Sequence, residues 1–257
     1  MKLLLKLLRV IYVVYAAIIF LGIMFLILPP IFLASLLGKE KGGNIIFYFL
    51  RFWAHAWFPL VGMRVTKEHL CKEGNEPCIF VVNHRSYLDA AIAVKVMRLP
   101  FRPLGKVEMS KIPFFGFIYR NSVVPVDRSN APARAKSVRE MMSMLKAGIS
   151  VLMFPEGTTN ETEAPLRPFH NGAFRMAIEM QIPLKPVLYV DAGDRFPAGK
   201  GGLMRLNPGK CRVVYLPPIS VDGLTLDDIN TLKQRVYDVM DAELRKRRKY
   251  PTLEVTR

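Results

Sequence analysis

An uncharged apolar segment opens the chain, since residues 10–38 contain no Asp, Glu, Lys, Arg or His. The part before the Pro29-Pro30 pair would reach roughly 28 Å as a helix, close to the thickness of a bilayer's hydrocarbon core. Three cations precede it, as in a signal peptide, but the run is too long for one and no small-x-small cleavage site follows. The pattern predicts a retained membrane helix, with removal as a signal peptide as the alternative.

A second apolar stretch, residues 45–60, is interrupted by Arg51 and His55, which share one helical face. Trp53 and Trp57 lie on a different face. Cations on one side and interfacial aromatic rings on another suit the headgroup layer better than the bilayer centre. We therefore predict a helical hairpin, bent near the Pro pair, that anchors in or dips into one leaflet. A pair of true spans and a pair of buried core helices are the alternatives.

After Met63 the pattern changes to short apolar runs that alternate with amphipathic segments. Runs typical of buried strands lie at 78–82, 123–126, 149–154, 184–190 and 211–216, and helical patterns lie at 87–97, 129–148, 173–180 and from about 226. Strands that alternate with helices predict an α/β fold, with a mainly parallel central sheet flanked by helices. The chain thus divides into a membrane-anchoring segment, 1–63, and an α/β domain, 64–257.

The composition adds a strong positive charge to this picture. The chain has 257 residues, of which 51% are hydrophobic, and its 37 Lys and Arg against 21 Asp and Glu give a net charge of +16. This excludes a disordered chain and favours phosphate-bearing partners, either nucleic acid, an anionic lipid surface or a phosphorylated substrate. Nucleic acid is disfavoured because the aromatic residues concentrate in the membrane segment. Three cysteines without a CxxC pair indicate neither a disulfide framework nor a metal site.

The peptide NHRSYLD, residues 83–89, directly follows the predicted strand 78–82. His84 and Asp89 can pair only if His84 lies in the turn and Asp89 in the first turn of the next helix. A carboxylate on one imidazole nitrogen leaves the other free to take a proton near neutral pH. The alternative is that Ser86 and Asp89 form a capping box and His84 merely packs.

A second unusual peptide, FPEGTTN at residues 154–160, follows the predicted strand 149–154. A glycine beside hydroxyl residues at a strand end lets backbone N–H groups approach an anion, although this could also be an ordinary turn. Glu156 needs a partner, either an arginine or a substrate hydroxyl. Arg128 also follows a strand and can bind phosphate bidentately or lie on the surface as a solvated charge.

Several chemistries find no motif in the chain. No Ser or Cys lies in a nucleophile elbow, and neither a P-loop nor a GxGxxG is present, which disfavours an acyl-enzyme, ATP and dinucleotides. Instead, NHRSYLD and FPEGT resemble the signatures of glycerolipid acyltransferases, specifically of lysophosphatidate acyltransferases. The resemblance extends over residues 77–190, through a block at 106–128 and IPLKPV at 182–187.

The resemblance implies a membrane-associated acyltransferase whose catalytic domain faces the cytoplasmic side of the inner membrane. It would move a fatty acyl group from acyl-CoA or acyl carrier protein to lysophosphatidate, giving phosphatidate in phospholipid biosynthesis, without a metal or further cofactor. His84 would be the general base and Asp89 would orient it. The substrate-binding positions would be Lys106 and Arg128 for the phosphate, with Glu156, Gly157 and Thr158 around the acceptor.

Two positions depart from the family pattern. Thr159 replaces the usual Arg after Glu-Gly-Thr, and His170 replaces a common Lys, although Arg167 could supply a cation. The alternatives are therefore an acyltransferase for another acceptor, such as glycerol 3-phosphate, a lyso-ornithine lipid or a lipid A precursor, and a non-catalytic lipid-binding membrane protein. The basic run at residues 245–249 could hold anionic lipid or simply end a helix favourably.

Overall fold

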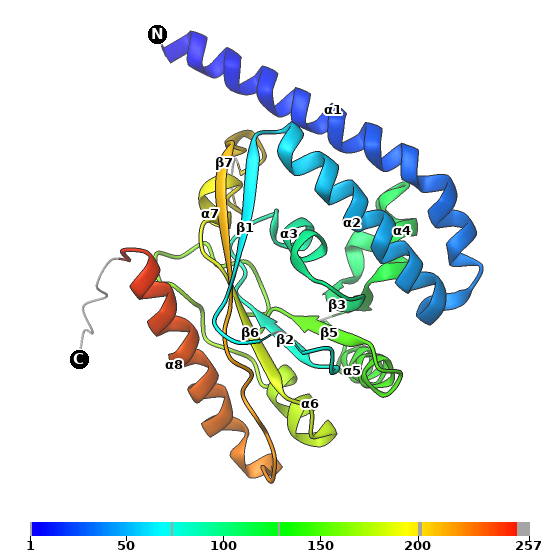
Figure 1. Cartoon of the computed structure of the whole chain (residues 1–257), viewed down its shortest axis with the longest axis vertical. Helices are drawn as coiled ribbons and strands as arrows, with labels where there is room; N and C mark the ends of the chain where they lie inside the picture. The colour runs from blue at the N-terminus through cyan, green and yellow to red at the C-terminus, as the bar shows by residue number, and fades with distance from the viewer. Residues whose placement is uncertain (1, 73, 128, 200–201, 251–257) are drawn as a thin grey trace.

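A computed structural model describes residues 2–72, 74–127, 129–199 and 202–250, and in these ranges the chain forms one seven-stranded sheet with helices on both faces (Figure 1). The strands are β1 (Met63–His69), β2 (Ile79–Val82), β3 (Phe101–Lys106), β4 (Val124–Val126), β5 (Ser150–Met153), β6 (Leu184–Tyr189) and β7 (Gly209–Tyr215). The helices are α1 (Lys2–Ser35), α2 (Gly43–Leu60), α3 (Asp89–Val96), α4 (Phe115–Ser122), α5 (Ala131–Lys146), α6 (Gly172–Met180), α7 (Ala192–Arg195) and α8 (Ile229–Arg247).

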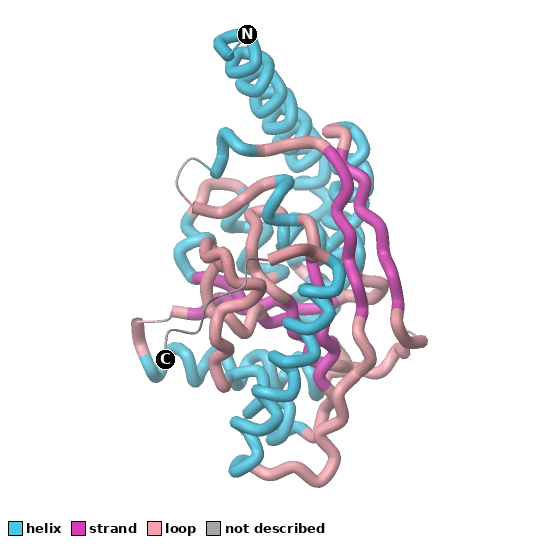
Figure 2. The backbone as a smooth tube through the Cα atoms, turned by 90° about the vertical axis from the view of Figure 1, so that its left-hand side faces the viewer, coloured by secondary structure: helices cyan, strands magenta, loops and turns pink. Residues whose placement is uncertain are grey.

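The sheet has the strand order β1-β7-β6-β2-β5-β3-β4. The strands from β6 to β4 are parallel to one another, whereas β7 is antiparallel to β6 and parallel to β1. Figure 2 shows β1 and β7 as two long strands side by side at one edge. The α/β fold with a mainly parallel sheet, predicted from alternating strands and helices, is confirmed.

Two apolar clusters cover the two faces of the sheet. On one face, α1 to α4 pack on inward residues such as Val82 and Val187. On the other, α5, α6 and α8 pack on residues such as Val81 and Leu188. Neighbouring strand residues thus point to opposite faces and both faces are buried, which explains why the strands β2, β5 and β6 are nearly continuous apolar runs.

The predicted N-terminal hairpin is present, but it does not turn at the Pro pair. Helix α1 continues through Pro29 and Pro30, and the chain reverses in a π-helical turn, η1 (Gly38–Gly42). Gly38 has φ +79°, and a Cβ at Gly42 would lie 2.2 Å from the carbonyl oxygen of Ala34. Glycines that allow this close approach therefore set the reversal. Because proline lacks a backbone N–H, helix α1 continues through the Pro pair with two of its own hydrogen bonds missing.

Trp53 and Trp57 are buried between α1 and α2, so the interfacial position expected for them is wrong. The indole N–H of Trp57 donates to the carbonyl oxygen of Ala16 at 2.9 Å, and that of Trp53 to Phe20 at 3.3 Å. Both rings also meet the Phe20 ring edge-on. The tryptophans hold the two helices together because α1 offers backbone carbonyls and an apolar surface at the same place.

Helix α1 remains the membrane candidate. Within the described residues, only its span Leu3–Ser35 is long and apolar enough to cross a bilayer, with a mean hydropathy of 2.8, and little of it is buried. Its first turns extend beyond the rest of the molecule (Figures 1 and 2). Helix α2 does not meet this criterion, so a pair of spans finds no support. The division into residues 1–63 and 64–257 stays a prediction.

Candidate active site

His84 and Asp89 meet at the carboxyl end of β2. His84 lies in the turn after the strand, Asp89 is the first residue of α3, and His84 Nδ1 lies 2.7 Å from Asp89 Oδ2. This is the arrangement that pairing of the two residues requires. An ionised carboxylate only accepts hydrogen bonds. In this pair Nδ1 therefore carries the hydrogen and donates a hydrogen bond to Asp89 Oδ2.

The Asp89 carboxylate is fully buried and also holds the backbone of the turn. Its Oδ2 accepts the backbone N–H groups of Arg85 and Ser86, both at 2.9 Å. The capping box that the sequence sets as the alternative is not formed, because the Ser86 hydroxyl accepts the Leu88 N–H and not that of Asp89. The turn and the imidazole are fixed relative to each other.

The imidazole of His84 is otherwise open. It stacks on the Phe154 ring with 4.2 Å between centroids, and its side chain is 26% exposed. No residue in the part of the chain that the structure describes hydrogen-bonds its Nε2. This nitrogen is therefore available to take a proton from a bound molecule.

The FPEGT turn, which follows the neighbouring strand β5, forms hydrogen bonds with the backbone of His84. Glu156 Oε1 accepts the His84 N–H at 2.7 Å, and the Asn160 N–H donates to the His84 carbonyl oxygen at 2.6 Å. Glu156 Oε2 accepts the Arg167 N–H at 2.9 Å, and the carboxylate is buried. The partners of Glu156 are therefore backbone N–H groups, not the arginine side chain or substrate hydroxyl considered from the sequence. It positions His84 and the loop at Arg167.

The next two residues of the motif differ in exposure. Gly157 has φ +69°, and a Cβ there would lie 2.5 Å from His170 Cδ2. The position therefore requires glycine both for its backbone and for its contact with His170. Thr158 is exposed beside it.

Of the predicted cations, Lys106 lies on the same edge of the sheet as His84, by topology. Strands β2, β5, β3 and β4 are parallel neighbours, so the segments that follow them share one edge. Lys106 ends β3, is exposed and pairs with Glu108 at 3.2 Å. Arg128, two residues past the end of β4, lies outside the described residues. Within those residues, no group of three or more His, Cys, Asp or Glu side chains could hold a metal ion.

Residues 62–190, half of the chain, match the Acyltransferase family. The chain belongs to the acyltransferase family. The enzyme is 31% identical over 189 residues to the 1-acyl-sn-glycerol-3-phosphate acyltransferase of Salmonella typhimurium, covering 72% of this chain and 75% of that one. It is 29% identical over 224 residues to the protein of the same name from Limnanthes douglasii, covering 84% and 73%.

The fold of the acyltransferase is also that of a solved structure. The crystal structure of the 1-acyl-sn-glycerophosphate acyltransferase PlsC from Thermotoga maritima matches with a TM-score of 0.75 at 20% identity, covering 98% of this chain and 100% of that chain. The shared architecture therefore includes the N-terminal hairpin as well as the sheet.

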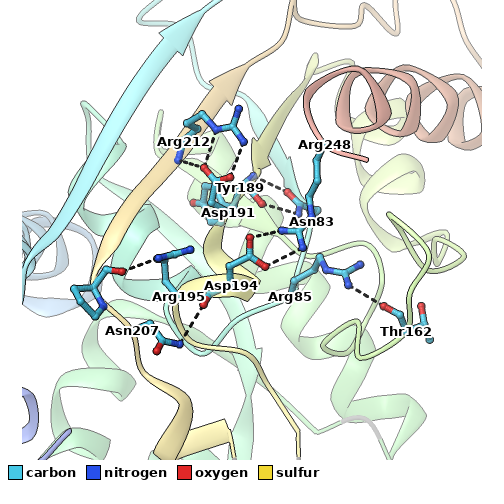
Figure 3. A network of polar contacts seen from close by, with 11 residues as sticks. Asn83, Arg85, Thr162, Tyr189, Asp191, Asp194, Arg195, Asn207, Arg212 and Arg248 are labelled. Atoms are coloured by element: carbon cyan, nitrogen blue, oxygen red, sulfur yellow. Dashed lines mark hydrogen bonds and ion pairs between the residues drawn. The ribbon is translucent and has the colours of Figure 1, made fainter. Parts of the chain in front are cut away.

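Asn83, part of the same motif, has a role that sequence reasoning missed. Its side chain is fully buried, where Oδ1 accepts the Tyr189 N–H at 2.7 Å and Nδ2 donates to the Tyr189 carbonyl oxygen at 3.2 Å (Figure 3). The amide thereby extends the β2–β6 pairing and fixes the start of the His84 turn in the acyltransferase. A polar amide directly after an apolar strand is the signal for it.

The basic run at residues 245–249 is tied largely to the acyltransferase itself. Arg248 makes a double ion pair with Asp194 at 2.6 and 2.8 Å (Figure 3). Arg245 pairs with Asp241, and Arg247 bridges to Glu68 on β1. These pairs favour a structural role at the end of α8 over lipid binding.

The buried carboxyl of Glu156 should make the free energy of unfolding depend on pH. Burial raises the pKa of its carboxyl from 4.5 to about 7, against the two N–H donors, which lower it. The folded state thus binds a proton more tightly than the unfolded state, so stability falls as pH rises from 4.5 to about 7, by about 3 kcal/mol. Urea unfolding across this range should show the decline in the native chain, and Glu156→Gln should remove it. An equal decline in both would contradict the assignment.

Proposed function

We propose that the acyltransferase moves a fatty acyl group from the thioester of acyl-CoA or acyl carrier protein to the free hydroxyl of lysophosphatidate, which makes phosphatidate. The observation that carries the proposal is the 2.7 Å contact between His84 Nδ1 and Asp89 Oδ2, with Nε2 left open. The names of the relatives at about 30% identity support the same acceptor.

The dyad accounts for the chemistry. His84 Nε2 takes the proton from the acceptor hydroxyl as its oxygen attacks the thioester carbonyl carbon. The carbon–sulfur bond then breaks, and the imidazolium returns the proton to the departing thiolate. Asp89 holds the imidazole in the productive tautomer and stabilises its charged form between the two steps. The donor's own carrier is the only cofactor in this scheme.

The substrate sites follow from the shared sheet edge. Lys106 and Arg128, after two neighbouring parallel strands, bind the acceptor phosphate as point charge and bidentate donor. Gly157 and Thr158 line the acceptor beside them, where the exposed Thr158 side chain can contact it. Glu156 contributes indirectly, because its carboxylate holds the His84 backbone.

The membrane location follows from how α1 is attached. Helix α2 lies along α1, with Tyr12 and Tyr15 bonded to its far end, and also packs on α3 and α4. If α1 stood across a bilayer, α2 and the domain behind it would enter the hydrocarbon core, where their polar groups would lose water. We therefore place α1 flat in one leaflet, with the domain on the cytoplasmic side, where soluble thioesters are available.

An acceptor panel tests the function. Purified full-length protein is given labelled acyl-CoA or acyl carrier protein and competing acceptors, and the products are separated by thin-layer chromatography. Label in phosphatidate is the expected result. Label in the product of glycerol 3-phosphate, a lyso-ornithine lipid or a lipid A precursor would reassign the acceptor, and absence of transfer would indicate a non-catalytic lipid-binding protein.

The phosphate site gives a second prediction. Lys106→Ala and Arg128→Ala should each raise the KM for lysophosphatidate by about tenfold, because one charged hydrogen bond is lost, and leave the KM for the donor unchanged. Lys146→Ala removes an exposed cation at the end of α5 and is the matched control. An effect confined to the donor would reassign either residue.

A further inference from the structure

The segment between β3 and α4 exposes apolar side chains at the active-site edge. It comprises the 3-10 turn η2 (Val107–Lys111), the residues that follow it, and the start of α4 up to Phe117. Its exposed apolar members are Met109, Ile112 and Phe114. The ring of Phe114 is 62% exposed. Soluble surfaces rarely gather apolar side chains in this way, and such patches mark contact with a partner or a membrane.

The backbone at Phe114 is strained, and its ring is exposed. Phe114 has φ +60°, and the Phe115 N–H donates to the Pro113 carbonyl oxygen at 2.6 Å across it. This is a γ-turn in the left-handed half of the map, which is strained for any residue with a Cβ. A bulky aromatic residue held in this conformation and left exposed suggests that its ring has a function outside the domain.

The segment continues the apolar surface of α1. Phe114 contacts Phe25 with 5.4 Å between ring centroids, and Phe117 lies 5.8 Å from Phe32. Between them an open groove of about 570 Å³ is lined by Leu28, Pro29, Phe32, Leu33, Phe114 and Phe117. Every lining residue is apolar, so the groove is suited to hydrocarbon rather than to water.

The surroundings of the patch are basic. Lys111 lies within the segment and Arg120 on the following helix, and both are exposed. Two acids lie nearby: Glu108, which is paired with Lys106, and Asp127, which accepts a hydrogen bond from the Ser129 hydroxyl. Cations at the edge of an apolar surface match anionic lipid headgroups above acyl chains, each contributing attraction near the surface.

We propose that residues 107–117 are a second membrane-inserting element, which enters the same leaflet of an anionic bilayer as α1 and whose groove is filled by lipid chains. The proposal rests on the membrane location in the proposed function. It would bring Lys106, which directly precedes the segment, to the headgroup level. A lysophosphatidate in the leaflet then presents its phosphate to Lys106 without leaving the membrane.

Fluorescence quenching tests the insertion directly, whatever the enzyme's substrate. In Phe114→Trp the new indole should be quenched by brominated lipids in vesicles of phosphatidylcholine and phosphatidylglycerol, beyond the signal of the buried Trp53 and Trp57. Leu226→Trp places an indole at a similarly exposed site, 46%, on the far end of the domain and should add no quenching. Equal quenching of the two variants on vesicle-bound protein would overturn the proposal.

Activity gives a second, separate readout. Phe114→Asp should bind the same vesicles about tenfold more weakly and acylate vesicle-embedded lysophosphatidate about tenfold more slowly. With a short-chain, water-soluble lysophosphatidate its rate should equal that of the native enzyme, and Leu226→Asp should behave natively in both assays. An equal loss with both acceptors would place Phe114 in the acceptor site and overturn the proposal. Failure of the native enzyme on every acceptor would instead reject the proposed function, with the quenching result unaffected.

Discussion

His84→Ala is expected to lower kcat for acyl transfer by about a thousandfold or more. General-base catalysis contributes roughly 10² to 10⁴ in rate, and among the described residues no other imidazole is paired with a carboxylate. The imidazole makes no side-chain bond except to Asp89, so its removal costs little stability. Single-turnover acyl transfer with saturating donor and acceptor measures the effect on the chemical step.

The matched control is His69→Ala. His69 ends β1, which runs opposite to β2 because β7, its parallel partner, is antiparallel to β6. His69 therefore lies at the opposite end of the strands from His84, and His69→Ala should retain full activity. Vesicle binding should be native in both variants. Near-native turnover by His84→Ala would exclude the general-base mechanism.

The sequence was sufficient for the elements around His84. Strands β2, β5 and β6 are nearly continuous apolar runs because both faces of the sheet are covered, and each is found within one or two residues. Helix caps are local in the same way: Asn130 caps α5 through its bond to the Ala133 N–H, and Thr225 with Asp228 forms a capping box. Such signals depend on neighbours in the chain.

Two strands escaped the sequence pattern for physical reasons. Edge strand β1 is mostly solvent-exposed and carries Arg64, Lys67 and Glu68, so it lacks an apolar run. Strand β3 contains Pro103 and Gly105, which disfavour strands in isolation. Both are held by pairing with β7 and β5, a tertiary effect that overrides local preference.

Distant partners explain the errors in the candidate site and the hairpin. Glu156 accepts one of its two hydrogen bonds from His84, 72 positions away, and Trp57 donates to Ala16, 41 positions away. Spacing along the chain identified these residues as unusual but could not name their partners. The sequence indicated an arginine or a substrate hydroxyl as the partner of Glu156 and an interfacial position for the indoles. In the folded chain their partners are backbone N–H groups and backbone carbonyl oxygens.

Arg102 was not singled out from the sequence, and replacing it should give the largest loss of stability. It lies on β3, is only 3% exposed, and its Nη2 donates to the carbonyl oxygens of Lys39 at 2.7 Å and Glu40 at 3.0 Å and to Asn44 Oδ1 at 2.9 Å. Burial lowers its pKa to about 10, so it stays charged at neutral pH. Arg102→Met removes the guanidinium from these three acceptors, of which the Glu40 carbonyl oxygen keeps the Gly43 N–H, and should cost about 3 kcal/mol.

Urea unfolding and hydrogen exchange across η1 and the start of α2 measure this loss. Arg98→Met, which removes an exposed arginine just before β3, is the control and should unfold as the native chain does. Matching midpoints for the two variants would refute a stabilising role for the buried guanidinium. Since β3 carries Arg102 near its start and Lys106 at its end, the hairpin and the proposed phosphate site share one strand. A raised KM for lysophosphatidate in Arg102→Met, absent from Arg98→Met, is therefore expected alongside the lost stability.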